Sequence, residues 1–178
     1  MLSRINILKS LLATVLFIGQ ISISTASQSD GLQLLKQENL VGEARMTYLF
    51  WDVYDAKLFA HDGQWRVDEP FILELNYLRS LKGKSIAERS IEEIRDQGFD
   101  NEVKLNEWLI TLVKIFPDVD ETSTIKGVVD EKRSTRFYLN DELIGTIEQP
   151  EFTTQFFNIW VGEKTSEPKL RKKLLGLS

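Results

Sequence analysis

The spacing of apolar residues changes several times along the chain, and this order of patterns constrains the fold more than any other feature. Period-two alternation predicts strands between residues 41 and 59 and over Phe71–Tyr77. Helical spacing follows over Ser85–Gly98 and Leu105–Phe116. Strand patterns then return over Ile125–Val129, Thr135–Leu139 and Leu143–Ile147, before helices from Pro150 to Gly162 and from Ser166 onward. This order indicates an α+β domain with a mostly antiparallel sheet.

Local signals place the ends of these elements. His61-Asp62-Gly63 predicts a turn, and Asn140-Asp141-Glu142 predicts a hairpin between the last two strands. The sequence Ser85-Ile86-Ala87-Glu88 has the pattern of a capping box, in which Ser85 would cap the helix that Gly98 ends. Pro117 would stop the second helix, and Pro150 suits a first helical position.

The segment from Ala44 to Trp51 differs from the other strands because both of its alternating sets become apolar near its end. This pattern predicts one strand that is covered on both faces. Arg45 and Thr47 fall on the same face as Leu49 and Trp51, so an arginine would face an apolar layer. Such an arginine requires an anion. That anion is either a buried glutamate or the carboxylate of a bound ligand, and both alternatives remain open.

The first 26 residues have the layout of a secretory signal peptide. The first nine residues carry two positive charges, Arg4 and Lys9. Leu11–Gly19 is a short apolar run, and Ser24-Thr25-Ala26 offers a cleavage site. We therefore expect removal of residues 1–26 and a single domain over 27–178, which begins with a polar arm or short helix at Ser27–Asn39. No second apolar run follows, so we expect no integral membrane segment after cleavage.

Charge and cysteine content narrow the range of partners. The chain has 22 Lys+Arg and 27 Asp+Glu, a net charge of −5, which becomes −7 once Arg4 and Lys9 leave with the leader. An acidic balance disfavours nucleic acid as a partner. The absence of cysteine excludes disulfides and thiolate metal sites, and it favours a Gram-negative periplasm over a eukaryotic extracellular space.

Several short motifs resemble functional motifs but lack residues or spacings that those motifs require. Gly83-Lys84-Ser85 resembles the end of a phosphate-binding loop, but the first glycine of that motif is replaced by Leu78. The acidic cluster Asp118–Glu121 lacks the spacing of a calcium loop, and the single histidine, His61, lies in a turn. Glu88, Glu92, Glu93 and Asp96 alternate with arginines at pairing distance, which predicts a solvated helix face. We therefore expect no metal and no cofactor.

Three stretches resemble a known family when they are taken in order. They are Gly42–Arg45 followed by Trp51–Leu58, then Leu81–Ser85 leading into a helix, and finally Phe152–Gly162 followed by Glu163–Pro168. Over Val41–Gly176 the chain resembles the chalcone isomerase-like family, in particular its bacterial exported members. The resemblance implies an open-faced sandwich, in which helices cover a long antiparallel sheet and a ligand cleft lies between the layers.

The plant members of that family divide into enzymes that close a chalcone to a flavanone and relatives that bind fatty acids. In both groups an arginine early in the first strand region faces the ligand, and Arg45 is the matching residue here. The enzymes also place a threonine, a tyrosine and an asparagine at positions that read Leu49, Ile86 and Glu93 in this chain. Leucine and isoleucine cannot donate hydrogen bonds to a ketone oxygen, so no catalytic residue is assigned.

The sequence therefore predicts a non-catalytic periplasmic domain with an apolar cleft for a small amphipathic ligand such as a fatty acid. The alternatives are an enzyme of another reaction that uses other cleft residues, and an interaction domain of the cell envelope. The residues expected to bind the ligand are Arg45, Thr47, Trp51, Tyr77 and Trp108.

Overall fold

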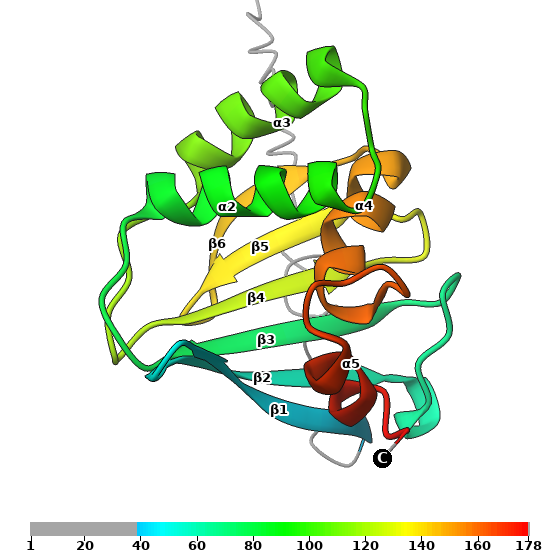
Figure 1. Ribbon diagram of the computed structural model, residues 1–178. Coiled ribbons are helices and arrows are strands. Elements are labelled where there is room, and N and C mark those ends of the chain that lie inside the picture. Colours follow the sequence, from blue (N-terminus) through cyan, green and yellow to red (C-terminus); the bar gives the residue numbers. More distant parts are fainter. Residues whose placement is uncertain (1–38, 178) are drawn as a thin grey trace, which may run out of the picture.

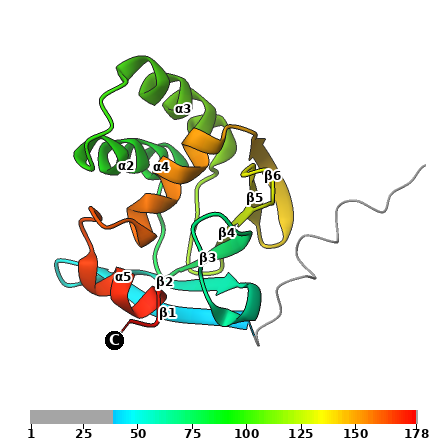
Figure 2. The same cartoon turned by 90° about the vertical axis from the view of Figure 1, so that its right-hand side faces the viewer.

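The computed structural model of the protein describes residues 39–177. The predicted signal peptide, residues 1–26, lies outside the described residues, and so does the predicted arm apart from Asn39. The described chain forms one sheet with helices on a single face (Figures 1 and 2). This arrangement confirms the predicted α+β class and the open-faced sandwich.

The sheet is an antiparallel meander in which every strand lies beside its neighbour in sequence. Its strands are β1 (Leu40–Tyr48), β2 (Trp51–Ala60), β3 (Phe71–Tyr77), β4 (Thr124–Val129), β5 (Thr135–Leu139) and β6 (Glu142–Ile147). Helices α2 (Gly83–Asp96) and α3 (Glu102–Ile115) are inserted between β3 and β4, and α4 (Pro150–Val161) and α5 (Pro168–Leu174) follow β6. Figure 2 shows α4 between the sheet and the α2–α3 pair, with α5 against β1 and β2.

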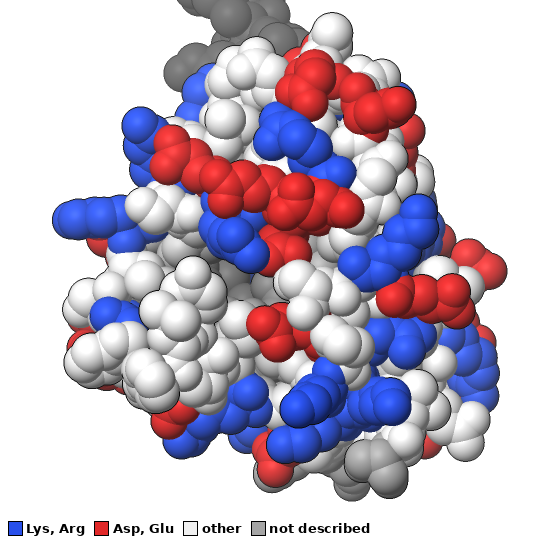
Figure 3. All heavy atoms as spheres, in the orientation of Figure 1, with Lys and Arg blue, Asp and Glu red and all other residues white. Residues whose placement is uncertain are grey.

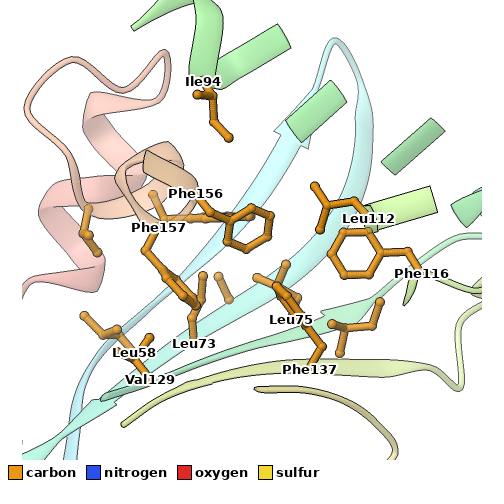
Figure 4. Close-up of a cluster of buried hydrophobic side chains, with 14 of the residues drawn as sticks. Leu58, Leu73, Leu75, Ile94, Leu112, Phe116, Val129, Phe137, Phe156 and Phe157 are labelled. Atoms are coloured by element: carbon orange, nitrogen blue, oxygen red, sulfur yellow. The ribbon is translucent and has the colours of Figure 1, made fainter. Parts of the chain in front are cut away.

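The main core lies between α4 and the sheet. Phe156 and Phe157 point from α4 toward Leu73, Leu75 and Phe137 on the strands (Figure 4). The rings of Phe156 and Phe137 meet edge to face with centroids 5.3 Å apart, a geometry that aromatic pairs favour. The helical layer is therefore held by close aromatic contacts near the middle of the sheet.

The prediction of one continuous strand from Ala44 to Trp51 is wrong. The chain reverses at Leu49 and Phe50, and Tyr48 pairs with Trp51 across the turn. Leu49 has a positive φ of 58°, and the turn contains none of the glycine, asparagine or aspartate residues that mark such reversals. Phe50 is 95% exposed, so the apolar run that predicted a covered strand forms a hairpin end in contact with solvent.

The predicted capping box at Ser85 is also wrong, because α2 begins two residues earlier, at Gly83. The amide of Gly83 donates a hydrogen bond to Oδ1 of Asp118 at 3.0 Å, so a residue distant in sequence satisfies the helix start. The other end signals are confirmed. Gly98 follows the end of α2, Pro117 follows α3, Pro150 opens α4, and Asn140 and Asp141 form the β5–β6 turn with positive φ angles.

Candidate functional site

A cavity of about 510 Å³ lies between the sheet and the helical layer. Its walls come from β1 to β5 on one side and from α2, α4 and α5 on the other. In Figure 3 the surface is hollowed between the charged row of α2 and the β1–β2 hairpin, which marks an opening on this side of the molecule. This volume falls within the range of small-molecule sites in proteins.

Strand β3 builds one wall because alternate residues of a strand face the same side. Leu73, Leu75 and Tyr77 line the cavity, and Arg79 continues the same alternation two residues beyond the strand end. The wall therefore changes from aliphatic to aromatic to cationic along one strand. This gradient suits a ligand with an apolar body and an acidic end.

Two tyrosines, one buried (Tyr77) and one partly buried (Tyr54), lie side by side in the wall. Tyr54 and Tyr77 are directly opposed in the β2–β3 register, and their rings meet edge to face at 6.1 Å. Nε1 of Trp160 donates a hydrogen bond to the Tyr54 hydroxyl at 3.0 Å. Burial raises the pKa of Tyr54 and of Tyr77 well above the ordinary value, so both keep their protons at neutral pH. They can donate hydrogen bonds to a ligand oxygen.

Arg79 is a cation that lines the cavity and has unusual surroundings. Its Nε is buried and has no hydrogen-bond partner among residues 39–177, and its guanidinium lies 5.2 Å from the ring centroid of Trp51. No carboxylate of the described chain forms an ion pair with it. A buried donor without a partner is costly in a finished core, so this side chain has hydrogen-bonding capacity available to a ligand.

A second polar cluster lines the cavity below α2. Glu93 is 6% exposed, it forms an ion pair with Arg89, and its Oε2 accepts a hydrogen bond from the Ser166 hydroxyl at 2.9 Å. The prediction that Glu93 belongs to a solvated face is therefore wrong. Glu93 lies three residues after the buried Ser90 and therefore on the same side of α2, where Ser166, in the loop before α5, contacts its carboxylate.

The structure places Arg45 and Thr47 on the face of the β1–β2 hairpin that points away from the cavity. Arg45 donates to Asp55 at 2.6 and 2.8 Å and to Asp52 at 3.0 Å, and Thr47 donates to Asp52 at 2.8 Å. The hydrogen bonds from Arg45 hold the pKa of Asp55 below its ordinary value. The expectation that Arg45 faces an apolar layer is wrong, and its acidic partners in the described chain are Asp52 and Asp55.

The other three predicted site residues lie apart from one another. Tyr77 is in the cavity wall, whereas Trp51 is 63% exposed at the hairpin end and touches the site only through Arg79. Trp108 is buried in the core between α3 and α4, where its Nε1 donates to Gln149 at 2.7 Å. Of the five predicted residues, the structure brings only Tyr77 to the cavity wall. Sequence reasoning missed Arg79, although the alternation of β3 extends to it.

The three positions at which the chain departs from the plant enzymes also lie apart from one another in the structure. Ile86 and Glu93 line the cavity, while Leu49 lies at the hairpin end and is 74% exposed. Within residues 39–177, no group of three or more histidine, aspartate or glutamate side chains is placed to hold a metal ion. None of the helices in this range is both long enough and apolar enough to cross a membrane.

Comparison with known proteins gives three findings. A family model described as chalcone isomerase-like matches residues 20–176. An uncharacterised protein of Haemophilus influenzae is 28% identical over 137 residues, which cover 76% of this chain and 67% of the relative.

Among solved structures, a fatty-acid binding protein of Arabidopsis thaliana superposes with a TM-score of 0.59 at 14% identity, covering 76% of this chain and 85% of that protein. At this identity the likeness is one of fold.

Proposed function

We propose that this chain, which belongs to the chalcone isomerase-like family, is a non-catalytic binding domain that holds a small amphipathic carboxylate such as a fatty acid. The observation that carries the proposal is Arg79, a cation without an acidic partner in the described chain, at the wall of an apolar cavity of about 510 Å³. The apolar part of the ligand would lie against Leu73, Leu75 and the α4 phenylalanines. Its carboxylate would accept hydrogen bonds from Arg79 and from Tyr77.

The chemistry of the cavity supports binding over catalysis. Ile86 offers no hydrogen-bond donor, and Glu93 is engaged by Arg89 and Ser166. The Arabidopsis protein of the same fold is described as a fatty-acid binding protein, which agrees with this choice of ligand. A cavity of this volume also argues against an interaction domain whose cleft is filled by its own side chains. A chalcone decay assay should accordingly show only the uncatalysed rate.

The test compares Arg79 with Arg45, an arginine on strand β1. Arg79→Met should weaken binding of a long-chain fatty acid by roughly ten- to hundredfold, because a charge-assisted hydrogen bond contributes about 1.5–3 kcal/mol. Arg45→Met removes an equal charge outside the cavity and should leave the affinity unchanged. Titration calorimetry measures both variants, and thermal unfolding confirms that each is folded.

Two outcomes would contradict the proposal. Equal affinities of the wild type and Arg79→Met would remove Arg79 from the site, and a loss confined to Arg45→Met would restore the prediction made from the sequence. Mass spectrometry of small molecules that copurify with the protein provides an independent measurement. A stoichiometric lipid carboxylate supports binding, whereas a copurifying compound of another class contradicts the choice of ligand.

We also propose that the domain acts in the periplasm, because residues 1–26 have the layout of a signal peptide. N-terminal sequencing of periplasmic material should then begin at Ser27. An intact Met1 on protein recovered from the cytoplasmic fraction would contradict this location.

A further inference from the structure

Four consecutive apolar side chains project from the end of the β1–β2 hairpin, and we call Tyr48, Leu49, Phe50 and Trp51 the hairpin tip. Their exposed fractions are 61%, 74%, 95% and 63%. Single exposed apolar residues are ordinary on protein surfaces, but four in a row that include three aromatic rings form a contiguous patch. A patch of this kind indicates an interaction surface.

The stability of the fold does not account for the residues of the hairpin tip. Leu49 adopts a positive φ of 58°, a conformation that glycine and asparagine tolerate and that bulky residues disfavour. Its side chain is mostly exposed, so it gains little from packing at this position. Backbone strain that no packing offsets is a feature of functional segments.

The hairpin tip adjoins the opening of the cavity. Tyr48 lines the cavity with part of its side chain although most of it is exposed, and the ring of Trp51 lies beneath the guanidinium of Arg79. In Figure 3 the uncharged protrusion formed by the hairpin stands directly beside the hollow under α2. A surface that contacts the tip therefore also meets the cavity opening.

We propose that the hairpin tip inserts into the surface of a lipid bilayer and presents the cavity opening to it. Tryptophan and tyrosine prefer the membrane–water interface, where their rings are apolar and their polar atoms remain hydrated. Phe50 and Leu49, at the extreme end of the hairpin, would reach deepest. An amphipathic ligand could then pass between bilayer and cavity without crossing water, a consequence that rests on the proposed function, whereas docking itself does not.

The shape and size of the hairpin tip favour a bilayer over a protein partner. The tip is a convex end of four residues, whereas a stable protein interface uses about 20–30 residues a side on matched surfaces. None of the four side chains carries a charge, and the chain has a net charge of −5. Docking therefore depends on apolar burial, and it should occur on neutral phosphatidylcholine and persist at high salt.

The test is flotation, with phosphatidylcholine vesicles, of the exported chain that begins at Ser27. The variant Leu49→Asn/Phe50→Asn removes the apolar end and suits the left-handed backbone at residue 49, so it should fold. We expect its partition onto vesicles to fall by at least tenfold, in proportion to the apolar area removed. The matched control, Val103→Gln/Ile110→Gln, removes two exposed apolar side chains from α3, at the other end of the molecule, and should bind as the wild type does (Figure 1).

A second measurement reports how deeply the hairpin tip enters the bilayer. Brominated phosphatidylcholine should quench the tryptophan fluorescence of the wild type, and Trp51→Phe should remove that quenching. The wild type and all variants begin at the same residue, Ser27, so a difference between them isolates the tip. Equal partition of the wild type and the tip variant would overturn the proposal. Self-association that depends on the tip, detected by sedimentation without vesicle binding, would overturn it in favour of a protein interface.

The fatty-acid affinity of the tip variant separates this proposal from the proposed function. Leu49 and Phe50 are outside the cavity lining, so the variant should bind a fatty acid in detergent-free solution as the wild type does. Vesicle binding that depends on the tip, together with no fatty-acid binding by any form, would contradict the proposed function and leave the membrane contact established.

Discussion

Glu93 shows how one side chain can depend on a partner that the sequence does not reveal. Its carboxylate is buried beside the cavity and is held by Arg89, which is one helical turn away, and by Ser166, which is 73 residues away. A buried charge is tolerated only while it is paired and hydrogen-bonded. The stability of this edge of α2 therefore rests on a contact with the loop before α5.

We predict that Arg89→Met lowers the free energy of unfolding by about 1–2 kcal/mol, because it leaves a buried carboxylate with one donor fewer while Ser166 still contributes. The double variant Arg89→Met/Glu93→Gln should recover most of this loss, since a neutral amide no longer requires the cation. Urea unfolding of both variants measures the difference. A double variant that is less stable than the single one would contradict this prediction, because the charged Glu93 carboxylate would then stabilise the fold without Arg89.

The sequence pattern assigned Arg45 to the wrong face of β1 for a simple geometric reason. The alternation predicted for β1 is confirmed, because Ala44 and Met46 face the helices and Arg45 and Thr47 face away from them. The choice of face, however, was made from Leu49 and Trp51, which lie in the turn and on the next strand. Alternation cannot be carried across a turn, so a turn without glycine or asparagine reversed the assignment.

At the scale of elements, the start of α2 depends on a contact with the segment after α3. A Cβ added to Gly83 would lie 2.1 Å from the carbonyl oxygen of Phe116 and 2.6 Å from that of Pro117. Backbone atoms cannot move aside cheaply, so this position requires glycine. The Gly-Lys-Ser sequence thus reflects close packing between two segments that are more than 30 residues apart.

We predict that Gly83→Ala lowers the free energy of unfolding by roughly 1–3 kcal/mol, the usual cost of forcing extra volume into a packed site. Ser85→Ala is the matched control within the same helix turn. Loss of a true cap costs about 1 kcal/mol, but Ser85 caps nothing here and its replacement should be nearly neutral. Thermal unfolding compares the two variants. A larger loss in Ser85→Ala than in Gly83→Ala would restore the capping box.

Elements with strong local end signals were predictable from the sequence. Pro117, Gly98, Pro150 and the Asn140-Asp141 pair each act through their own backbone preferences, and the helices and strands end where those residues indicate. The hairpin tip and the first turn of α2 were not predictable, because one lacks turn residues and the other is capped from a distance. The cavity was expected from family resemblance, but Arg79, which lines it, lies beyond the predicted strand.

At the scale of the whole molecule, acid should weaken the fold through several carboxylates at once. Partners hold four pKa values below their ordinary levels, those of Asp55 by Arg45, Glu102 by Arg95, Asp118 by Lys82, and Asp120 by Thr122. A carboxylate whose pKa is lowered in the folded state stabilises that state at pH values above its ordinary pKa. This contribution is lost as the pH falls through the lowered pKa.

We predict a melting temperature that is flat from neutral pH to about 5 and then falls steadily as the pH drops below the ordinary aspartate value of 3.8. Scanning calorimetry across this range measures the curve. Asp118→Asn should reduce the slope in acid, because one of the four linked protons is then absent. A melting temperature that rises on acidification would show that the acidic net charge outweighs these pairs.

The contact between β1 and α5 allows the order of the elements along the chain to be changed. A Cβ at Gly42 would lie 2.2 Å from the carbonyl oxygen of Lys173, and one at Gly176 would lie 3.3 Å from that of Val41, so the two ends of the described domain adjoin. A short linker could join them, and new ends could be opened at the exposed Asn140-Asp141 turn without breaking a strand. Such a circular permutant would keep every layer of the sandwich while beginning at β6.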